Sequence, residues 1–153
     1  MSAARLTVRA IRTTAVEVPM KHVLGTSQAA VRAAPLLLVD LQTEEGVVGR
    51  AYLFCYVPAA AAAIASLMTE VERVVKGEPV APPVLAAKLQ KRFTLIGVQG
   101  VVRMAMSGFD VACWDAAAIA AGQPLARFLG GVPRPVRAYN SNGLGLMAPA
   151  KLA

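Results

Sequence analysis

The sequence predicts an α+β domain, in which a three-stranded antiparallel sheet precedes a helical bundle. Apolar, β-branched stretches in the first third of the chain indicate strands. Apolar residues at helical spacing in the middle of the chain indicate packed helices. The composition supports a folded domain, because 153 residues that are 56% hydrophobic and 16% charged can bury a core and do not fit intrinsic disorder.

The predicted sheet occupies the N-terminal part of the chain. Residues 5–18 are rich in Val, Thr and Ile with interleaved charges, which indicates a strand exposed on one face. Residues 36–43 and 47–56 are two further strand-like runs, and the Glu-Glu-Gly connection between them predicts a hairpin. Residues 20–34 show neither period, which predicts a loop of about fifteen residues, a length that is usually functional or disordered.

The predicted helices follow. Pro58 suits a first helical position, and apolar residues recur from Ile64 at intervals of three and four until Gly77 and Pro79 end the helix. Three more helices are predicted at 84–93, 101–121 and 125–129. The segment 136–143 reads as one more strand but has no partner after it. We therefore expect one domain over 1–134 and the start of a second over 135–153.

Charge and cysteine usage narrow the function classes. The formal charge is +7, but the basic residues are spread singly and no aromatic platform accompanies them, so no nucleic-acid partner is expected.

Residues 51–69 are uncharged, yet Pro58 divides them, which favours a strand and a helix over a membrane span. The N-terminus does not fit a signal peptide. Cys55 and Cys113 lie in apolar runs without a CxxC pair, which indicates buried thiols in a reducing, cytoplasmic setting.

Few residues are available for acid–base or metal chemistry. The chain has nine acidic residues and one His, and no Asp, Glu or His follows Asp115. Asp110 and Asp115 are five residues apart, so they differ by about 140° around a helix and do not form an acid–base pair. We expect them to cap, to pair with Arg or to face solvent. Tyr56, where a strand leaves the sheet, is a candidate pocket wall, and an ordinary rim aromatic is about equally compatible with the pattern.

Three stretches of the sequence carry a family resemblance. DLQTEEGVVGRAYLFCYVP, AMSGFDVACWDAAAIAAGQPLARFLGG and VPRPVRAYNS together resemble the N-terminal region of the enolase superfamily. Trp114-Asp115 followed by G-x-P-L-x-x-x-L-G-G over 122–131 is the most specific part. The resemblance, over about residues 5–143, is to the mandelate racemase/muconate lactonizing enzyme group, and within it to the racemase type.

The resemblance implies a capping domain that closes the mouth of a TIM-type barrel. In this family the barrel holds a Mg²⁺ on three carboxylates, and Lys or His bases remove the α-proton of a carboxylate substrate. The family's Lys-x-Lys, carboxylate ligands and His-Asp dyad match nothing in residues 1–153, so we expect no catalytic residue and no metal ligand in this chain, and no activity from it alone. The implied partners are a small carboxylate substrate, the barrel, and further copies in a homo-oligomer.

Four residues match substrate-binding positions of the family. Leu24 and Val31 match the apolar pocket of a first selecting loop, Tyr56 matches the aromatic residue of a second loop, and Ser141 matches a residue on the first barrel strand. Leu24 is bulkier than the family residue, and Asn140 and Asn142 flank Ser141 in place of an acidic residue and a His. Lys21 and Arg32 are also unlike the racemase type, so a more polar or anionic substrate is possible.

The sequence therefore leads to one principal hypothesis and two alternatives. The principal hypothesis is the substrate-specificity part of a racemase-like, Mg²⁺-dependent enzyme acting on a 2-hydroxy carboxylate. An acid-sugar dehydratase or a muconate lactonizing-type enzyme is the alternative within the family. A non-catalytic, stand-alone binding or oligomerisation domain is the alternative from another class.

Overall fold

The computed structural model describes residues 5–25 and 30–139. Its regular elements are, in chain order, β1 (Val8–Gly25), β2 (Ala30–Thr43), β3 (Val48–Phe54), α1 (Pro58–Val75), α2 (Pro82–Phe93), α3 (Gly100–Ala120) and α4 (Leu125–Phe128). The predicted class, a three-stranded sheet followed by helices, is confirmed. No helix of the described residues is long and apolar enough to cross a membrane.

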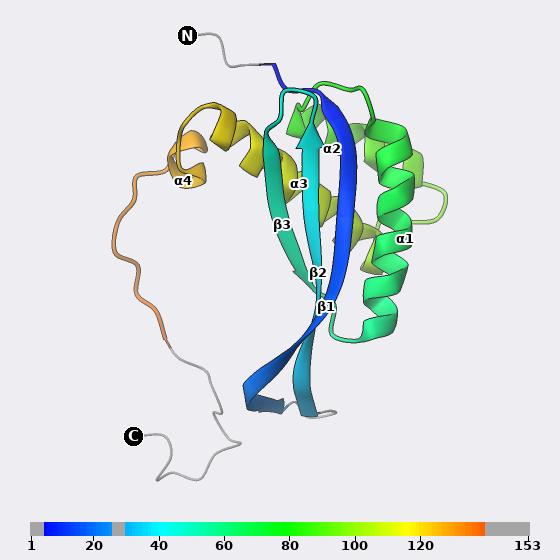
Figure 1. Ribbon diagram of the computed structural model, residues 1–153, viewed down its shortest axis with the longest axis vertical. Helices are drawn as coiled ribbons and strands as arrows, with labels where there is room; N and C mark the ends of the chain where they lie inside the picture. Colours follow the sequence, from blue (N-terminus) through cyan, green and yellow to red (C-terminus); the bar gives the residue numbers. More distant parts are fainter. Residues whose placement is uncertain (1–4, 26–29, 140–153) are drawn as a thin grey trace.

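The sheet has the order β1-β2-β3 and both pairings are antiparallel. Helices α1 and α3 cover one face of it, while α2 packs on α3 and α4 lies beyond the end of α3 (Figure 1). Because one face of the sheet is covered, the side chains of β2 alternate between buried and exposed. Leu37, Val39 and Leu41 are fully buried under the helices, whereas Leu38 is 40% exposed on the other face.

The helices occur where the apolar spacing predicts them. Pro58 stands in the first turn of α1, and Ile64, Met68 and Val71 form its buried stripe. The buried stripe of α3 is built largely from small residues, including Ala105, Ala112 and Ala116, which lets this helix approach the sheet closely. The predicted bounds of the helices differ from the observed bounds by no more than two residues.

One sequence prediction is wrong in the fold. Residues 20–34 do not form a long loop, because their described part continues β1 and β2 as paired strands out to Gly25 and Ala30. The error arose because the pattern is interrupted where β1 bulges. Of the predicted strand at 136–143, residues 136–139 form no strand and 140–143 lie outside the described residues, so its place in a barrel stays a prediction.

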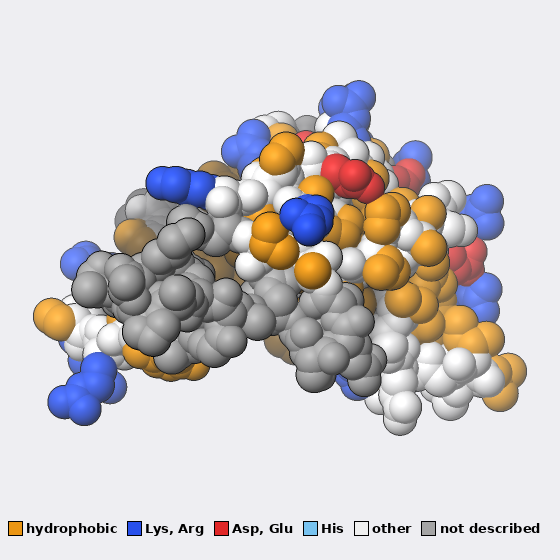
Figure 2. Space-filling model, turned by 90° about the horizontal axis from the view of Figure 1, so that it is seen from below, with side chains coloured by type: hydrophobic (Ala, Val, Ile, Leu, Met, Phe, Trp, Pro, Cys, Tyr) orange, Lys and Arg blue, Asp and Glu red, His pale blue; other side chains and the backbone are white. Residues whose placement is uncertain are grey.

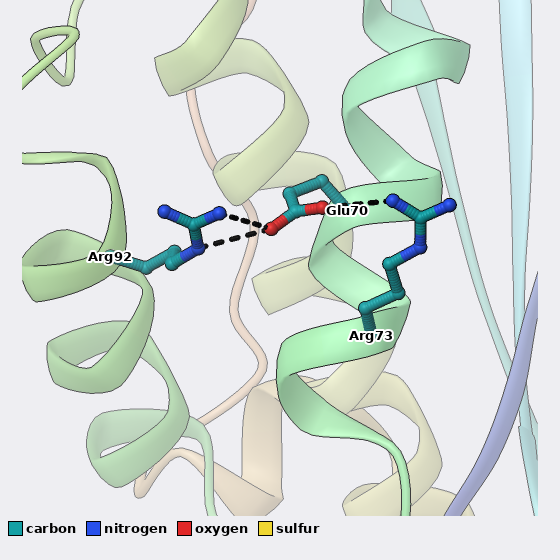
Figure 3. A network of polar contacts seen from close by, with 3 residues as sticks. All are labelled: Glu70, Arg73 and Arg92. Carbon is teal, nitrogen blue, oxygen red and sulfur yellow. Dashed lines mark hydrogen bonds and ion pairs between the residues drawn. The ribbon is translucent and has the colours of Figure 1, made fainter.

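An ion-pair network joins the first two helices on the surface (Figure 3). Arg92 of α2 donates from two nitrogens to one oxygen of Glu70 on α1, at 3.0 and 2.6 Å, and Arg73 donates to the other oxygen at 3.3 Å. The hydrogen bond from Arg92 is the main reason that the pKa of Glu70 lies below its ordinary value, and Arg73 adds to it.

We expect Glu70→Gln to lower Tm by no more than about 3 °C, because the guanidinium partners are largely exposed and water and salt screen such pairs. Thermal melts at low and high salt measure this. The lowered pKa means that the contribution is present above the unfolded pKa and disappears as the pH falls. A larger loss of Tm that persists at high salt would contradict this assignment.

Candidate functional site

Three of the predicted substrate-binding residues, Leu24, Val31 and Tyr56, lie at one end of the molecule. There β1 and β2 extend past the end of β3 as a two-stranded arm (residues 18–25 and 30–34), beside the connection from β3 to α1 (Figure 1). The last pair that involves β3 is Leu36 with Phe54, so the arm has no third strand. A two-stranded ribbon is marginally stable in water alone, which favours a role in contact with something else.

The arm is bent by an irregularity in β1. Between the pairs Pro19–Ala33 and Leu24–Val31, β1 has four residues where β2 has only Arg32. Extra residues of this kind bend a strand and redirect the side chains beyond them. The irregularity therefore sets the direction in which the end of the arm points.

Two of the predicted substrate-binding residues are cross-strand neighbours on this arm. Leu24 pairs directly with Val31, and Val31 is half-buried. Because side chains alternate along a strand, Val31 shares a face of β2 with Pro35, whereas Arg32 lies on the opposite face. Arg32 therefore does not share a face with Val31, which weakens it as a source of charge in the same pocket. The side chain of Leu24 lies outside the described part.

Tyr56 stands at the base of the arm in an unusual backbone conformation. Its φ is +62°, and it is the only residue other than glycine with a positive φ in the described part of the chain. The N–H of Val57 donates to the carbonyl of Cys55 at 2.7 Å, which closes a three-residue turn around Tyr56. Such a turn is strained for a bulky residue, and strained residues concentrate at functional sites.

The surroundings hold Tyr56 in this position. Cys55 is 1% exposed, and its N–H donates to the carbonyl of Pro35 at 2.8 Å, which ties the turn to β2. The ring of Tyr56 stands edge-on to that of Phe54, with 4.7 Å between centroids and an interplanar angle of 87°. Tyr56 itself is 69% exposed, so its ring is presented outward as a rigid apolar surface with a polar tip.

The described residues at this end do not enclose a ligand. The hollow beside the turn, between β1, Pro35 and the first turn of α1, has a volume of about 110 Å³. Small-molecule sites usually measure a few hundred Å³. On the described surface at this end, hydrophobic side chains are interspersed with Lys, Arg and acidic side chains, and further Lys and Arg project at its outline (Figure 2). The surface is therefore suited to form one wall of a site.

No metal centre is formed within the described residues, where no group of three or more His, Cys, Asp or Glu side chains could hold an ion. Asp110 and Asp115 have separate surroundings. Burial raises the pKa of Asp110, whereas the carboxylate of Asp115 accepts the N–H of Arg50 at 2.8 Å. Asp115 thus accepts a backbone N–H of β3, which differs from the helix cap, the ion pair with Arg and the solvent-facing position expected from the sequence.

The Trp-Asp pair is structural throughout. Trp114 packs edge-on against Phe128 of α4, with 6.2 Å between ring centroids. Together with the Asp115 hydrogen bond to β3, this contact ties α3 to both α4 and β3. The most recognisable part of the sequence thus lies far from the arm. Ser141, the fourth predicted substrate-binding residue, lies outside the described residues.

An antiparallel sheet with helices on one face and a projecting arm defines the class of protein, an α+β domain. Residues 8–130 match the family model of the mandelate racemase/muconate lactonizing enzyme N-terminal domain, and the chain belongs to this family. The resemblance seen in the sequence is confirmed, and the structural neighbours are members of the enolase superfamily.

Solved structures of longer proteins share this fold. An enolase from the alphaproteobacterium BAL199, solved with bound Mg, is 40% identical with a TM-score of 0.89 over 97% of this chain and 41% of that one. A Bradyrhizobium enolase in complex with magnesium and mandelic acid is 36% identical, with a TM-score of 0.84 over 91% of this chain and 38% of its own. The chain therefore spans about two-fifths of the length of these proteins.

More distant relatives share the fold. An L-talarate dehydratase from Polaromonas sp. JS666, in complex with Mg and L-glucarate, is 22% identical with a TM-score of 0.71 over 84% of this chain and 36% of its own. Magnesium accompanies all three of these proteins, as expected for a Mg-dependent family.

Proposed function

We propose that this chain is the substrate-selecting cap of a Mg²⁺-dependent, racemase-like enzyme that removes the α-proton of a 2-hydroxy carboxylate. The observation that carries the proposal is the arm, which places Leu24 opposite Val31 at the end of the molecule where Tyr56 is held in a strained turn. The 36% identity to an enolase that binds mandelic acid supports an aryl 2-hydroxy acid as the substrate class.

The role of the described residues in such an enzyme is to bind and to exclude water. An apolar wall from the arm and the Tyr56 ring would contact the side group of the substrate and keep solvent from the reacting carbon. A magnesium ion, held outside the described residues, would stabilise the negative charge that develops on the substrate. Since the described residues contain no metal cluster, we assign no step through the metal to them.

Three further parts of the proposal depend on this role. We place the boundary between the cap and the start of the barrel at residues 134 and 135, and Ser141 on the first barrel strand. The two buried free thiols fit a reducing cytoplasm. Homo-oligomeric assembly, which the family resemblance implies, is also part of the proposal.

The isolated chain and a chimera test the proposal together. We expect the isolated chain to show no exchange of the mandelate α-proton with D₂O in the presence of Mg²⁺, as followed by NMR. Residues 1–139 joined to the remaining portion of the Bradyrhizobium relative should bind mandelate, detected by calorimetry, and should catalyse that exchange. Exchange by the isolated chain would contradict the proposal.

Two tyrosines provide the matched comparison within the chimera. Tyr56→Ala should lower kcat/KM about 10- to 100-fold by removing an apolar contact to the substrate. Tyr52→Ala should leave kcat/KM unchanged, because Tyr52 is equally exposed at 69% but lies on the open face of the sheet. A chimera that folds, does not bind mandelate and shows no change in kcat/KM on Tyr56→Ala would favour the alternative of a stand-alone binding or oligomerisation domain.

A further inference from the structure

The two edges of the sheet are the places where another strand could bind. In the order β1-β2-β3, β1 and β3 are the edge strands of the sheet that the described residues form. Such edges are templates for pairing with a second copy of the chain, and natural proteins usually cover, bend or charge them. The protection of these edges therefore affects whether copies of the chain associate through their sheets.

Helix α1 and the segment that follows it occupy the first part of the β1 edge. The N–H of Val8 donates to the carbonyl of Glu78 at 2.9 Å, and the N–H of Gly77 donates back to the carbonyl of Val8 at 2.8 Å. Further along β1, the N–H of Ile11 donates to the Glu72 carboxylate of α1 at 2.7 Å. A side chain thus continues the coverage where the backbone segment ends.

Helix α3 provides the same kind of contact at the opposite edge. The N–H of Arg50 in β3 donates to the carboxylate of Asp115 at 2.8 Å. The side chain of Arg50 interacts separately with Asp40, with 3.7 Å between Nε and the nearer carboxylate oxygen. Glu72 of α1 and Asp115 of α3 therefore each accept one backbone N–H, at opposite edges of the same sheet.

We propose that Glu72 and Asp115 guard the sheet against edge-to-edge pairing with a second copy of this chain. An added strand would have to place a carbonyl oxygen at the N–H that each carboxylate occupies. The carboxylate fills that position and repels a carbonyl oxygen, because the carboxylate is negatively charged and the carbonyl oxygen carries a partial negative charge. This role accounts for Asp115 in the Trp-Asp pair without giving it any part in catalysis.

Removal of the guards should increase self-association. We expect Glu72→Ala/Asp115→Ala to show concentration-dependent association in sedimentation velocity beyond that of the unaltered chain. Amide hydrogen exchange should quicken about tenfold or more at Ile11 and Arg50, while amides that pair with β2 remain protected. If the double variant fails to fold, each single variant carries the same test at its own edge.

Matched variants separate the guarding role from a general loss of charge or stability. Glu70→Ala removes an acidic residue from α1, and Asp40→Ala removes one beside Arg50, but neither touches an edge N–H. Both should sediment as the unaltered chain does, and Asp115→Asn, which keeps an acceptor oxygen, should also do so. Equal association in these variants, or none in the guard variants despite faster exchange, would overturn the proposal.

Discussion

Gly49→Ala should lower the free energy of unfolding by at least about 3 kcal/mol, which makes it one of the most damaging small substitutions in this chain. Gly49 lies in β3 where α3 crosses it. A methyl group at this position would overlap the carbonyl oxygen of Ala112 and would lie 2.7 Å from the backbone nitrogen of Ala116. Both are backbone atoms, so the helix would have to move off the sheet.

A second glycine provides the control. Gly46 has a φ of +82°, but no atom lies within 4 Å of the place that a Cβ would occupy. Gly46→Ala should therefore cost only the backbone strain, about 1–2 kcal/mol. Urea unfolding of both variants measures the difference, and the midpoint for Gly49→Ala should fall by roughly 1 M or more. Equal losses in the two variants would show that contact with α3 is unimportant.

The helices could be predicted from the sequence because their signals are local. Pro58 marks the start of α1, and the apolar spacing from Ile64 onward gives its buried face directly. The small residues of α3 predicted close packing, and Ala112 does lie against β3. Each of these inferences needed no information from residues far away in the sequence, because a helix makes its hydrogen bonds within one segment.

The arm could not be predicted in the same way. A strand is stabilised by a partner that is distant in sequence, and the four irregular residues of β1 between Pro19 and Leu24 remove the two-residue alternation that would mark it. Proline usually interrupts a strand, yet Pro19 and Pro35 are both accommodated within paired strands. The loop prediction was thus wrong in conformation, although it located the segment that projects from the domain.

The candidate site was predictable in part. The resemblance pointed to Leu24 and Val31, and the register makes them neighbours, but their role in binding stays a prediction. Neither the positive φ of Tyr56 nor its contact with Phe54 has a sequence signal, since a non-glycine residue before Val-Pro gives no hint of such a turn. The carboxylate contacts of Glu72 and Asp115 join residues 61 and 65 positions apart, so no local pattern reveals them.

The buried thiols should make the domain sensitive to alkaline pH. Cys113 is fully buried, and burial together with the negative charge of nearby Asp110 raises the pKa of its thiol far above the ordinary value. Burial also raises the pKa of the Cys55 thiol. Both thiols therefore stay protonated in the folded protein at a pH where they ionise in the unfolded chain, whose thiols titrate near about 8.5.

The sign of the effect follows from proton binding. Above pH of about 8.5 the unfolded chain binds fewer protons than the folded one, so the free energy of unfolding should fall by about 1.4 kcal/mol per pH unit for Cys113, with a further loss from Cys55. The stability is complete below that pH and disappears as the pH rises.

Cys113→Ala isolates this contribution, because alanine keeps an apolar side chain in the core and has no proton to lose. Urea unfolding at intervals between pH 7.5 and 10.5 should give a clearly smaller pH slope for Cys113→Ala than for the unaltered chain, whatever the absolute stabilities. Cys55→Ala/Cys113→Ala should reduce the slope further. Parallel slopes in all three proteins would mean that other groups govern the alkaline transition and that the thiols ionise equally in both states.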